Sequence, residues 1–258
     1  MRFIGVLLLI FCLVSCNKPS SDTLVIGTIA GPETEVIETA KKIAETRYGL
    51  NIKLVEFNDY NLPNEALQDG SLDANIYQHL PYLQTAIAAH HYDLEAIGRT
   101  FVYPVGIYSQ RYKSLQEIPE GSIIAIPNDP SNEARALLLL EKAKLITLNA
   151  NNAGPIPQIA TNVKHLQFKE MDAAQLPRVL PDVAAAVINT TFALPAGLSP
   201  SKDALFVETK DSPYANIMVV KRNSAKKKQL LLFIQALNSK EVQEKAQKLF
   251  GDAAIPAW

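Results

Sequence analysis

The sequence TLVIGTIAGPETEVIETAKKIAETRYGLNIKLVEF, residues 23–57, decides the fold class. Residues 23–29 are β-branched and almost continuously apolar, which is typical of a strand covered on both faces. Residues 34–48 then repeat apolar side chains at helical spacing, and Gly49 is a typical helix stop. A second strand follows at 52–57. This β-α-β order predicts a parallel sheet with helical crossovers, and hence an α/β protein.

The stretch that follows, FNDYNLPNEALQDGSLDANIYQHLPYL at 57–83, is rich in asparagine and tyrosine and keeps no regular apolar period. Its turn residues predict a short helix, a strand and the opening of a second helix, at 61–67, 73–77 and 79–81. A strand that ends in polar and aromatic side chains, just before a helix, is where open α/β sheets bind small ligands. On the residues alone, Tyr60, Tyr77 and Tyr82 are either pocket residues or core aromatics.

Strands and helices continue to alternate along the rest of the chain. We predict extended segments at 94–109 (interrupted by Gly98 and Pro104), 123–127, 165–171, 184–189, 204–210 and 215–222. We predict helices at 81–91, 131–145, 173–179, 230–237 and 242–250. The long extended segment, kinked by Pro104, suits a connection between two α/β lobes joined by hinge strands. We expect 23–108 and 193–258 to form the first lobe and 109–192 the second.

The N-terminus carries the pattern of an export signal. Arg2 precedes an uninterrupted apolar run at 3–14, which is too short to span a bilayer of roughly 30 Å as a helix but suits a signal peptide. The run ends in Leu-Val-Ser-Cys, which resembles the lipobox of bacterial lipoproteins. The resemblance implies that 1–15 is removed, that Cys16 carries lipid, and that 16–22 is a tether to a bacterial membrane, on its periplasmic face. The alternative is a plain secretory signal.

Composition and charge argue against several classes of protein. Apolar residues are 48% and charged residues 20%, as in ordinary globular proteins. The net charge is -1 with signs alternating along the chain, which argues against a nucleic-acid partner because such partners require a concentrated basic face. The chain has neither a GxSxG nor an HExxH motif, and Cys16 is the one cysteine outside the signal peptide. We therefore predict that it is not an enzyme, and expect no catalytic residue, metal site or cofactor.

The stretch IPNDPSNEAR, residues 126–135, points to an anion site. A buried strand turns into a helix capped by Asp129, and the free N–H groups of a helix start attract anions. Arg135 lies one turn further in, where a guanidinium can grip an amino acid's carboxylate with two hydrogen bonds. The alternative for Arg135 is an ion pair with a local acid on a solvated face. Asn189 and Asn216 each end an apolar strand and suit either ligand contacts or turn caps.

Five segments together resemble the methionine-binding lipoprotein family (NlpA-type lipoproteins), the substrate-binding components of methionine ABC importers. They are FNDYNLPNEAL, SLDANIYQHLPYL, AIPNDPSNEARALLLLE, AAAVINTTFALPAGL and SPYANIMVV, in this order. The resemblance covers residues 23–258 and agrees with the lipobox. It implies a type II periplasmic-binding-protein fold with methionine enclosed between two lobes. It also implies permease and ATPase subunits as partners, and we expect a monomer.

The resemblance also implies which residues bind the ligand. The side-chain pocket would consist of Tyr60, Tyr77, His79 and Tyr82. Arg135 would hold the carboxylate, and the amine and carboxylate would be ordered by Asn75, Asn132, Asn189 and Asn216. Aromatic walls suit a thioether, since S···aromatic contacts contribute ~0.3–1.5 kcal/mol each, and His79 should be neutral beside it.

Two positions depart from the family pattern. Tyr77 stands where Phe is common, and Ala184 stands where Asp is frequent. The hydroxyl of Tyr77 leaves methionine derivatives, another amino acid or a short methionyl peptide as alternative ligands. A third possibility is a surface lipoprotein with a role other than transport.

Overall fold

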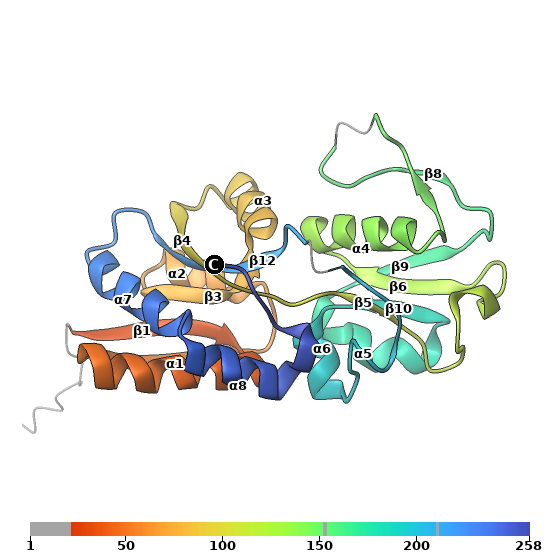
Figure 1. Cartoon of the computed structure of the whole chain (residues 1–258). Coiled ribbons are helices and arrows are strands. Elements are labelled where there is room, and N and C mark those ends of the chain that lie inside the picture. The colour runs from red at the N-terminus through yellow and green to blue at the C-terminus, as the bar shows by residue number, and fades with distance from the viewer. Residues whose placement is uncertain (1–21, 152–153, 210–211) are drawn as a thin grey trace, which may run out of the picture.

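The computed structural model describes residues 22–151, 154–209 and 212–258. The predicted signal peptide (1–15), Cys16 and the tether up to residue 21 lie outside the described residues. Two mixed sheets lie side by side, and each has helices on both faces (Figure 1). Within the described ranges, no helix is both long and apolar enough to cross a membrane.

The first sheet contains strands from both ends of the chain. In spatial order its strands are β13 (Ile255–Pro256), β4 (Leu94–Val102), β12 (Ala215–Lys221), β3 (Ala74–His79), β1 (Thr23–Ile29) and β2 (Asn51–Phe57). β1 pairs in parallel with β2 and β3, which confirms the predicted β-α-β unit. β12 lies antiparallel between β3 and β4. The returning chain therefore places β12 directly beside β3, the strand that ends in polar and aromatic residues.

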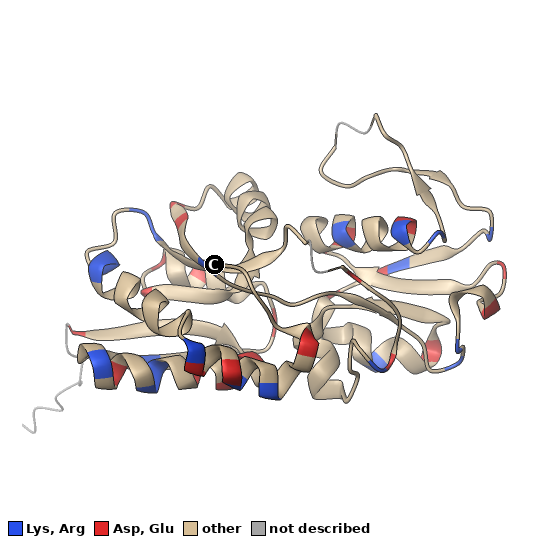
Figure 2. Cartoon of the chain, in the orientation of Figure 1, with Lys and Arg blue, Asp and Glu red and all other residues tan. Residues whose placement is uncertain are grey.

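Helices cover both faces of this sheet. One face carries α1 (Pro32–Tyr48), α7 (Lys227–Leu237) and α8 (Lys240–Phe250), and the other carries α2 (Leu62–Gln68) and α3 (Leu80–His90). α1 stops at Gly49, whose φ of 64° forms the left-handed cap that the sequence predicts. Charges of both signs alternate along α1 and α8 (Figure 2), and Lys245 of α8 pairs with Glu35 of α1 at 2.7 Å.

The second sheet is built on the same plan. In spatial order its strands are β11 (Ala204–Val207), β5 (Gly106–Tyr108), β10 (Ala185–Ile188), β6 (Ile123–Pro127) and β9 (Gln167–Met171). α4 (Pro130–Lys142) packs on one face, and α5 (Leu176–Val179) and α6 (Thr190–Ala193) pack on the other. A separate hairpin, β7 (Thr147–Leu148) and β8 (Ile159–Thr161), projects beyond α4 (Figure 1). No local sequence pattern predicts this hairpin.

The predicted lobe boundaries at 108/109 and 192/193 are wrong. β5 and β11 both pair within the second sheet, although the sequence analysis assigns them to the first lobe. The chain therefore crosses between the sheets at 103–105 and returns after Val207. Pro104 explains the first crossing, because proline cannot donate to a sheet and ends the ladder there. The two crossing segments meet, since the N–H of Glu208 donates to the Val105 carbonyl at 2.9 Å.

Gly98 does not interrupt the strand as predicted, because β4 runs through it. Its role is to let α7 approach the sheet closely. A Cβ atom at Gly98 would lie 2.4 Å from Cδ1 and 3.1 Å from Cγ2 of Ile234, so any larger residue would force Ile234 to move.

Candidate ligand-binding site

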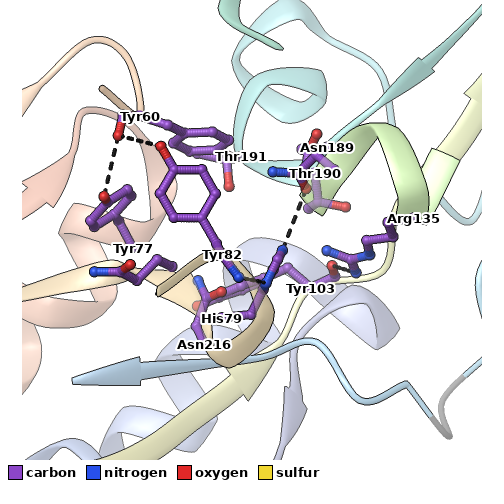
Figure 3. Close-up of a pocket in the computed structure, with 12 residues that line it drawn as sticks. Tyr60, Tyr77, His79, Tyr82, Tyr103, Arg135, Asn189, Thr190, Thr191 and Asn216 are labelled. Atoms are coloured by element: carbon purple, nitrogen blue, oxygen red, sulfur yellow. Dashed lines mark hydrogen bonds between the residues drawn. The ribbon is translucent and has the colours of Figure 1, made fainter. Parts of the chain in front are cut away.

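A cavity lies between the two lobes, where the end of β3 faces the first turns of α4 and α6 (Figure 3). Its lining residues are Tyr60, Tyr77, Gln78, His79, Tyr82, Tyr103, Asn132, Arg135, Asn189, Thr190, Thr191 and Asn216. It encloses about 350 Å³ of space free of atoms, part of it open to solvent, and little of it is wide enough for a water molecule. An amino acid can therefore enter only if the walls move apart.

All the predicted ligand-binding residues except Asn75 line this cavity. Asn75 is fully buried, and both ends of its amide are occupied. Its Nδ2 donates to the Pro63 carbonyl and to Asn64 Oδ1, and its Oδ1 accepts from Gln78 Nε2. The structure therefore does not bring Asn75 to the cavity. Its amide ties α2 to β3 instead.

The aromatic wall of the cavity consists of Tyr60, Tyr77 and Tyr82 from the first lobe, and Phe192 from the second lobe packs on the ring of Tyr60. The centroid of the Tyr60 ring lies 5.8 Å from that of Tyr77 and 4.8 Å from that of Phe192. The hydroxyls of Tyr77 and Tyr82 both donate to the Tyr60 carbonyl, at 3.2 and 2.8 Å (Figure 3). Because the backbone satisfies these hydroxyls, the wall can offer aromatic carbon to a ligand.

His79 lies where this wall meets the polar side of the cavity. It caps α3, and its Nδ1 accepts from the Tyr82 N–H at 3.2 Å. The ring proton is therefore on Nε2, which lies 3.4 Å from Asn132 Oδ1. Burial, followed by the nearby charge of Arg135, lowers the pKa of His79 from 6.5 to about 3. The imidazole is therefore neutral at physiological pH.

The polar wall consists of Asn132, Arg135, Asn189 and Asn216. Arg135 is 4% exposed and already paired. Its Nε and Nη2 donate to the carboxylate of Glu208 at 3.2 and 2.5 Å. The pair is neither local nor solvated, because its members are 73 residues apart and both are buried. The solvated local ion pair considered as an alternative is therefore wrong.

Two more groups hold the guanidinium of Arg135 in place. Nη2 also donates to the Tyr103 carbonyl at 3.1 Å, and the guanidinium carbon lies 4.4 Å from the centroid of the Tyr214 ring. Tyr103 and Glu208 belong to the two segments that cross between the lobes. Nη1 is the one guanidinium nitrogen with no hydrogen bond to any described residue, and it remains available to a ligand.

The asparagines of the polar wall are held by acids. Asn189 Nδ2 donates to Asn132 Oδ1 at 2.9 Å, and Asn132 Nδ2 donates to both carboxylate oxygens of Asp129 at 3.0 Å. Asp129 also caps α4 as predicted, accepting from the Asn132 N–H at 2.9 Å. Asn216 Nδ2 donates to Glu33 at 3.3 Å. The predicted turn-cap role is not seen for Asn189, whose side chain makes no cap to α6.

Glu33 is a buried acid behind the polar wall. Its second carboxylate oxygen accepts from the hydroxyl of Thr191, which joins α1 of the first lobe to α6 of the second. Burial raises the pKa of Glu33 from 4.5 to about 7, because the loss of hydration outweighs the hydrogen bonds from Thr191 and Asn216.

Several residues of this site are not predicted from the sequence. Thr190 and Thr191 directly follow Asn189, so the strand-end signal that identifies Asn189 could have been extended to them. Glu33 resembles an ordinary acid in the first turn of a helix. Its partners Thr191 and Asn216 are 158 and 183 residues away, and no local pattern marks such a contact.

Known proteins resemble this chain over nearly its whole length. The NlpA lipoprotein family matches residues 24–258. The chain belongs to this family. It is 45% identical to the D-methionine-binding lipoprotein MetQ of Escherichia coli (strain K12), over 99% of this chain and 96% of that protein. The motif-based family assignment is therefore confirmed.

Solved structures of similar proteins share the fold. A periplasmic substrate-binding protein of an ABC transporter from Coxiella burnetii is 53% identical with a TM-score of 0.87, over 91% of this chain and 100% of that one. A nutrient-binding protein from Burkholderia cenocepacia, bound to methionine, is 44% identical with a TM-score of 0.88, over 91% and 100%. The predicted two-lobed fold of periplasmic binding proteins is confirmed.

Proposed function

We propose that this NlpA-family protein captures methionine, as the L or D form, and delivers it to an ABC importer. The main support for the proposal is the cavity between the two lobes. Its aromatic wall faces the buried guanidinium of Arg135 and the side-chain amides of three asparagines. The names of its relatives support methionine as the ligand, since they include D-methionine-binding MetQ and a protein bound to methionine. In this role the protein is a monomeric binding component and not an enzyme.

The two walls suit the two ends of methionine. The thioether would lie against Tyr60, Tyr77 and Tyr82, beside the neutral ring of His79, because sulfur packs favourably on aromatic rings. The carboxylate would accept from Nη1 of Arg135, the guanidinium nitrogen left free by Glu208. The other amino-acid groups would meet the amides of Asn132, Asn189 and Asn216.

The protein would work as a hinged clamp. The crossing segments at 103–105 and after Val207 are the hinges, and the narrow cavity requires the lobes to separate before a ligand enters. A ligand that contacts both walls stabilises the closed state, since those contacts exist only when the walls meet. Permease and ATPase subunits would then receive the closed form. A lipid on Cys16 would keep the protein in the cell envelope, on the periplasmic face of the membrane.

Thermal unfolding of the purified protein with and without ligand tests this function. A ligand that binds only the native state adds about 2.7 kcal/mol of stability at a hundredfold excess over its Kd. We expect L- or D-methionine to raise the melting temperature, and leucine and alanine to leave it unchanged. If no form of methionine changes the melting temperature, the result favours a role other than transport. A larger shift with a methionyl dipeptide would move the proposal to peptides.

A further inference from the structure

Two amide oxygens of the polar wall lack a donor. Asn189 Oδ1 is buried and accepts no hydrogen bond from any described residue. Asn216 donates its Nδ2 to Glu33, and no described residue donates to its Oδ1. Both side chains line the same cavity. Two side chains that line the cavity therefore carry acceptors that a ligand donor could satisfy.

The orientation of Asn189 follows from Asp129. A carboxylate only accepts hydrogen bonds, so Asn132 must turn its NH₂ group toward Asp129 and its Oδ1 away. Asn132 Oδ1 then accepts from Asn189 Nδ2 at 2.9 Å, and it also lies 3.4 Å from the protonated Nε2 of His79. Asn189 has to use its NH₂ group for this bond. Its oxygen is left for the ligand.

The orientation of Asn216 follows from Glu33 in the same way. Glu33 accepts from Asn216 Nδ2 at 3.3 Å, and its other oxygen accepts from Thr191. The NH₂ group of Asn216 is committed to the acid, so its oxygen is the group left over. Neither Glu33 nor Asp129 lines the cavity, and both act through the asparagines that do.

We propose that Asp129 and Glu33 are positioning residues that turn the amide oxygens of Asn189 and Asn216 toward the ammonium group of the ligand, and so make the site specific for amines. The inference rests on the proposed function and extends it to ligand selection. An ammonium group donates hydrogen bonds and cannot accept them, which matches two oriented acceptors backed by negative charge. A site built to bond a donor rejects an analogue that lacks it, because the acceptors then stay unpaired.

Glu33 gives this selection a pH dependence. Burial raises its pKa to about 7. The titratable groups that interact with its charge are the phenols of Tyr60 and Tyr103, whose pKa values are raised well above their usual range by burial first and by the charge of Glu33 second. Tyr60 also feels the charge of Asp129. These phenols stay neutral near pH 7, while Glu33 loses its charge below it. Affinity for an amine should therefore fall as the pH drops through about 7.

Calorimetric titration with two ligands tests the inference. One is methionine, and the other is its desamino analogue, the same thioether acid with hydrogen in place of the ammonium group. We expect Glu33→Gln and Asp129→Asn each to weaken methionine binding about tenfold or more, and to change binding of the analogue less than about threefold. Asp129→Asn keeps a helix-capping side chain. The matched control is Glu35→Gln, which removes an exposed acid, paired with Lys245 at the surface, from the same turn of α1.

The pH profile of the wild-type chain is the second measurement, and it requires no variant to fold. Methionine affinity should fall between about pH 8 and 6, and affinity for the analogue should stay flat. Equal losses for both ligands in both variants, or a methionine affinity that is independent of pH, would overturn the inference while leaving methionine binding intact. A wild-type chain that binds neither ligand would remove the proposed function, and the inference with it.

Discussion

The aromatic wall and the polar wall of the cavity are held in place in different ways. Tyr77 and Tyr82 share a single backbone acceptor, the carbonyl of Tyr60, and otherwise pack as rings. In the polar wall each orientation depends on the next group, as in the series Asp129, Asn132, Asn189. Ring packing is non-directional and tolerates change, whereas a buried hydrogen-bond network loses several bonds when one member changes. The polar wall should therefore be much more sensitive to substitution.

Arg135→Ala should have the largest effect of any change in either wall. It leaves the carboxylate of Glu208 buried without its ion-pair partner, which costs about 3–5 kcal/mol. It also removes the proposed carboxylate contact, so affinity for methionine should drop more than tenfold. Urea unfolding and calorimetric titration measure the two effects separately.

A double variant separates stability from binding at this pair. Replacing a buried ion pair by neutral groups of similar size is often nearly neutral for stability. Arg135→Met with Glu208→Gln should therefore unfold close to the wild type and still bind methionine more than tenfold more weakly. If Arg135→Ala alone is as stable as the wild type, the ion pair of Arg135 with Glu208 does not support the folded state.

Glu33→Gln should stabilise the protein while weakening its binding. The folded-state pKa of about 7 lies above the ordinary value of 4.5, so the native state binds more protons between these values. Stability therefore falls as the pH rises from 4.5 through 7, by about 3 kcal/mol once Glu33 is fully ionised. Gln carries no charge, so the variant should melt higher than the wild type near pH ~8.

The pH dependence of that stability difference identifies its cause. The advantage of Glu33→Gln should disappear near pH ~4, where Glu33 is protonated in both the native and the unfolded state. Glu35→Gln, in the same helix turn, removes an exposed acid and its surface ion pair with Lys245, and is the control for the loss of an acid from the start of the helix. An advantage that is equal at both pH values would mean that packing, and not the charge of Glu33, is responsible.

His79 should give a smaller effect of the opposite sign, because it is buried without charge between the two walls. Its folded-state pKa of about 3 lies below 6.5, so the unfolded chain binds more protons between these values. Stability therefore falls as the pH drops through this range, by about 2–3 kcal/mol near pH ~4.5. His79→Gln should remove this loss in urea unfolding. His90→Gln, an exposed histidine at the end of α3, should keep it.

Much of this fold can be predicted from the sequence because its signals are local. The β-branched run at 23–29, the helix stop at Gly49 and the Asp129 cap each act within a few residues, and all three are confirmed. The lobe assignment of β5 and β11 depends on strand pairing across the chain, which no local pattern contains.

The site was predictable only in part for the same reason. Asn75 lies in one of the family motifs, yet it does not line the cavity. Its amide is hydrogen-bonded to Pro63 and Asn64 of α2 instead. The sequence predicts Arg135 as a carboxylate-binding guanidinium one turn inside a helix start, but it does not indicate the partner Glu208, which is 73 residues away. Residue type and strand-end position locate side chains near a cleft. The bonds that those side chains already make decide which atoms are left for a ligand.

Tyr77→Phe should have the smallest effect, and it tests whether the aromatic wall really tolerates change. The Tyr77 hydroxyl donates to the Tyr60 carbonyl at 3.2 Å, while Tyr82 donates to the same oxygen at 2.8 Å. Losing the longer bond leaves the carbonyl paired, so stability should change by less than about 1 kcal/mol and methionine affinity by less than about threefold.

The double variant Tyr77→Phe with Tyr82→Phe removes both donors and should cost more than the sum of the single changes, because the Tyr60 carbonyl then has neither hydroxyl. Urea unfolding and calorimetric titration of the three variants measure this difference. A loss of affinity beyond tenfold in Tyr77→Phe alone would mean that the hydroxyl contacts the ligand. The aromatic wall would then recognise polar groups as the opposite wall does, and the ligand would carry a polar group where methionine carries its thioether.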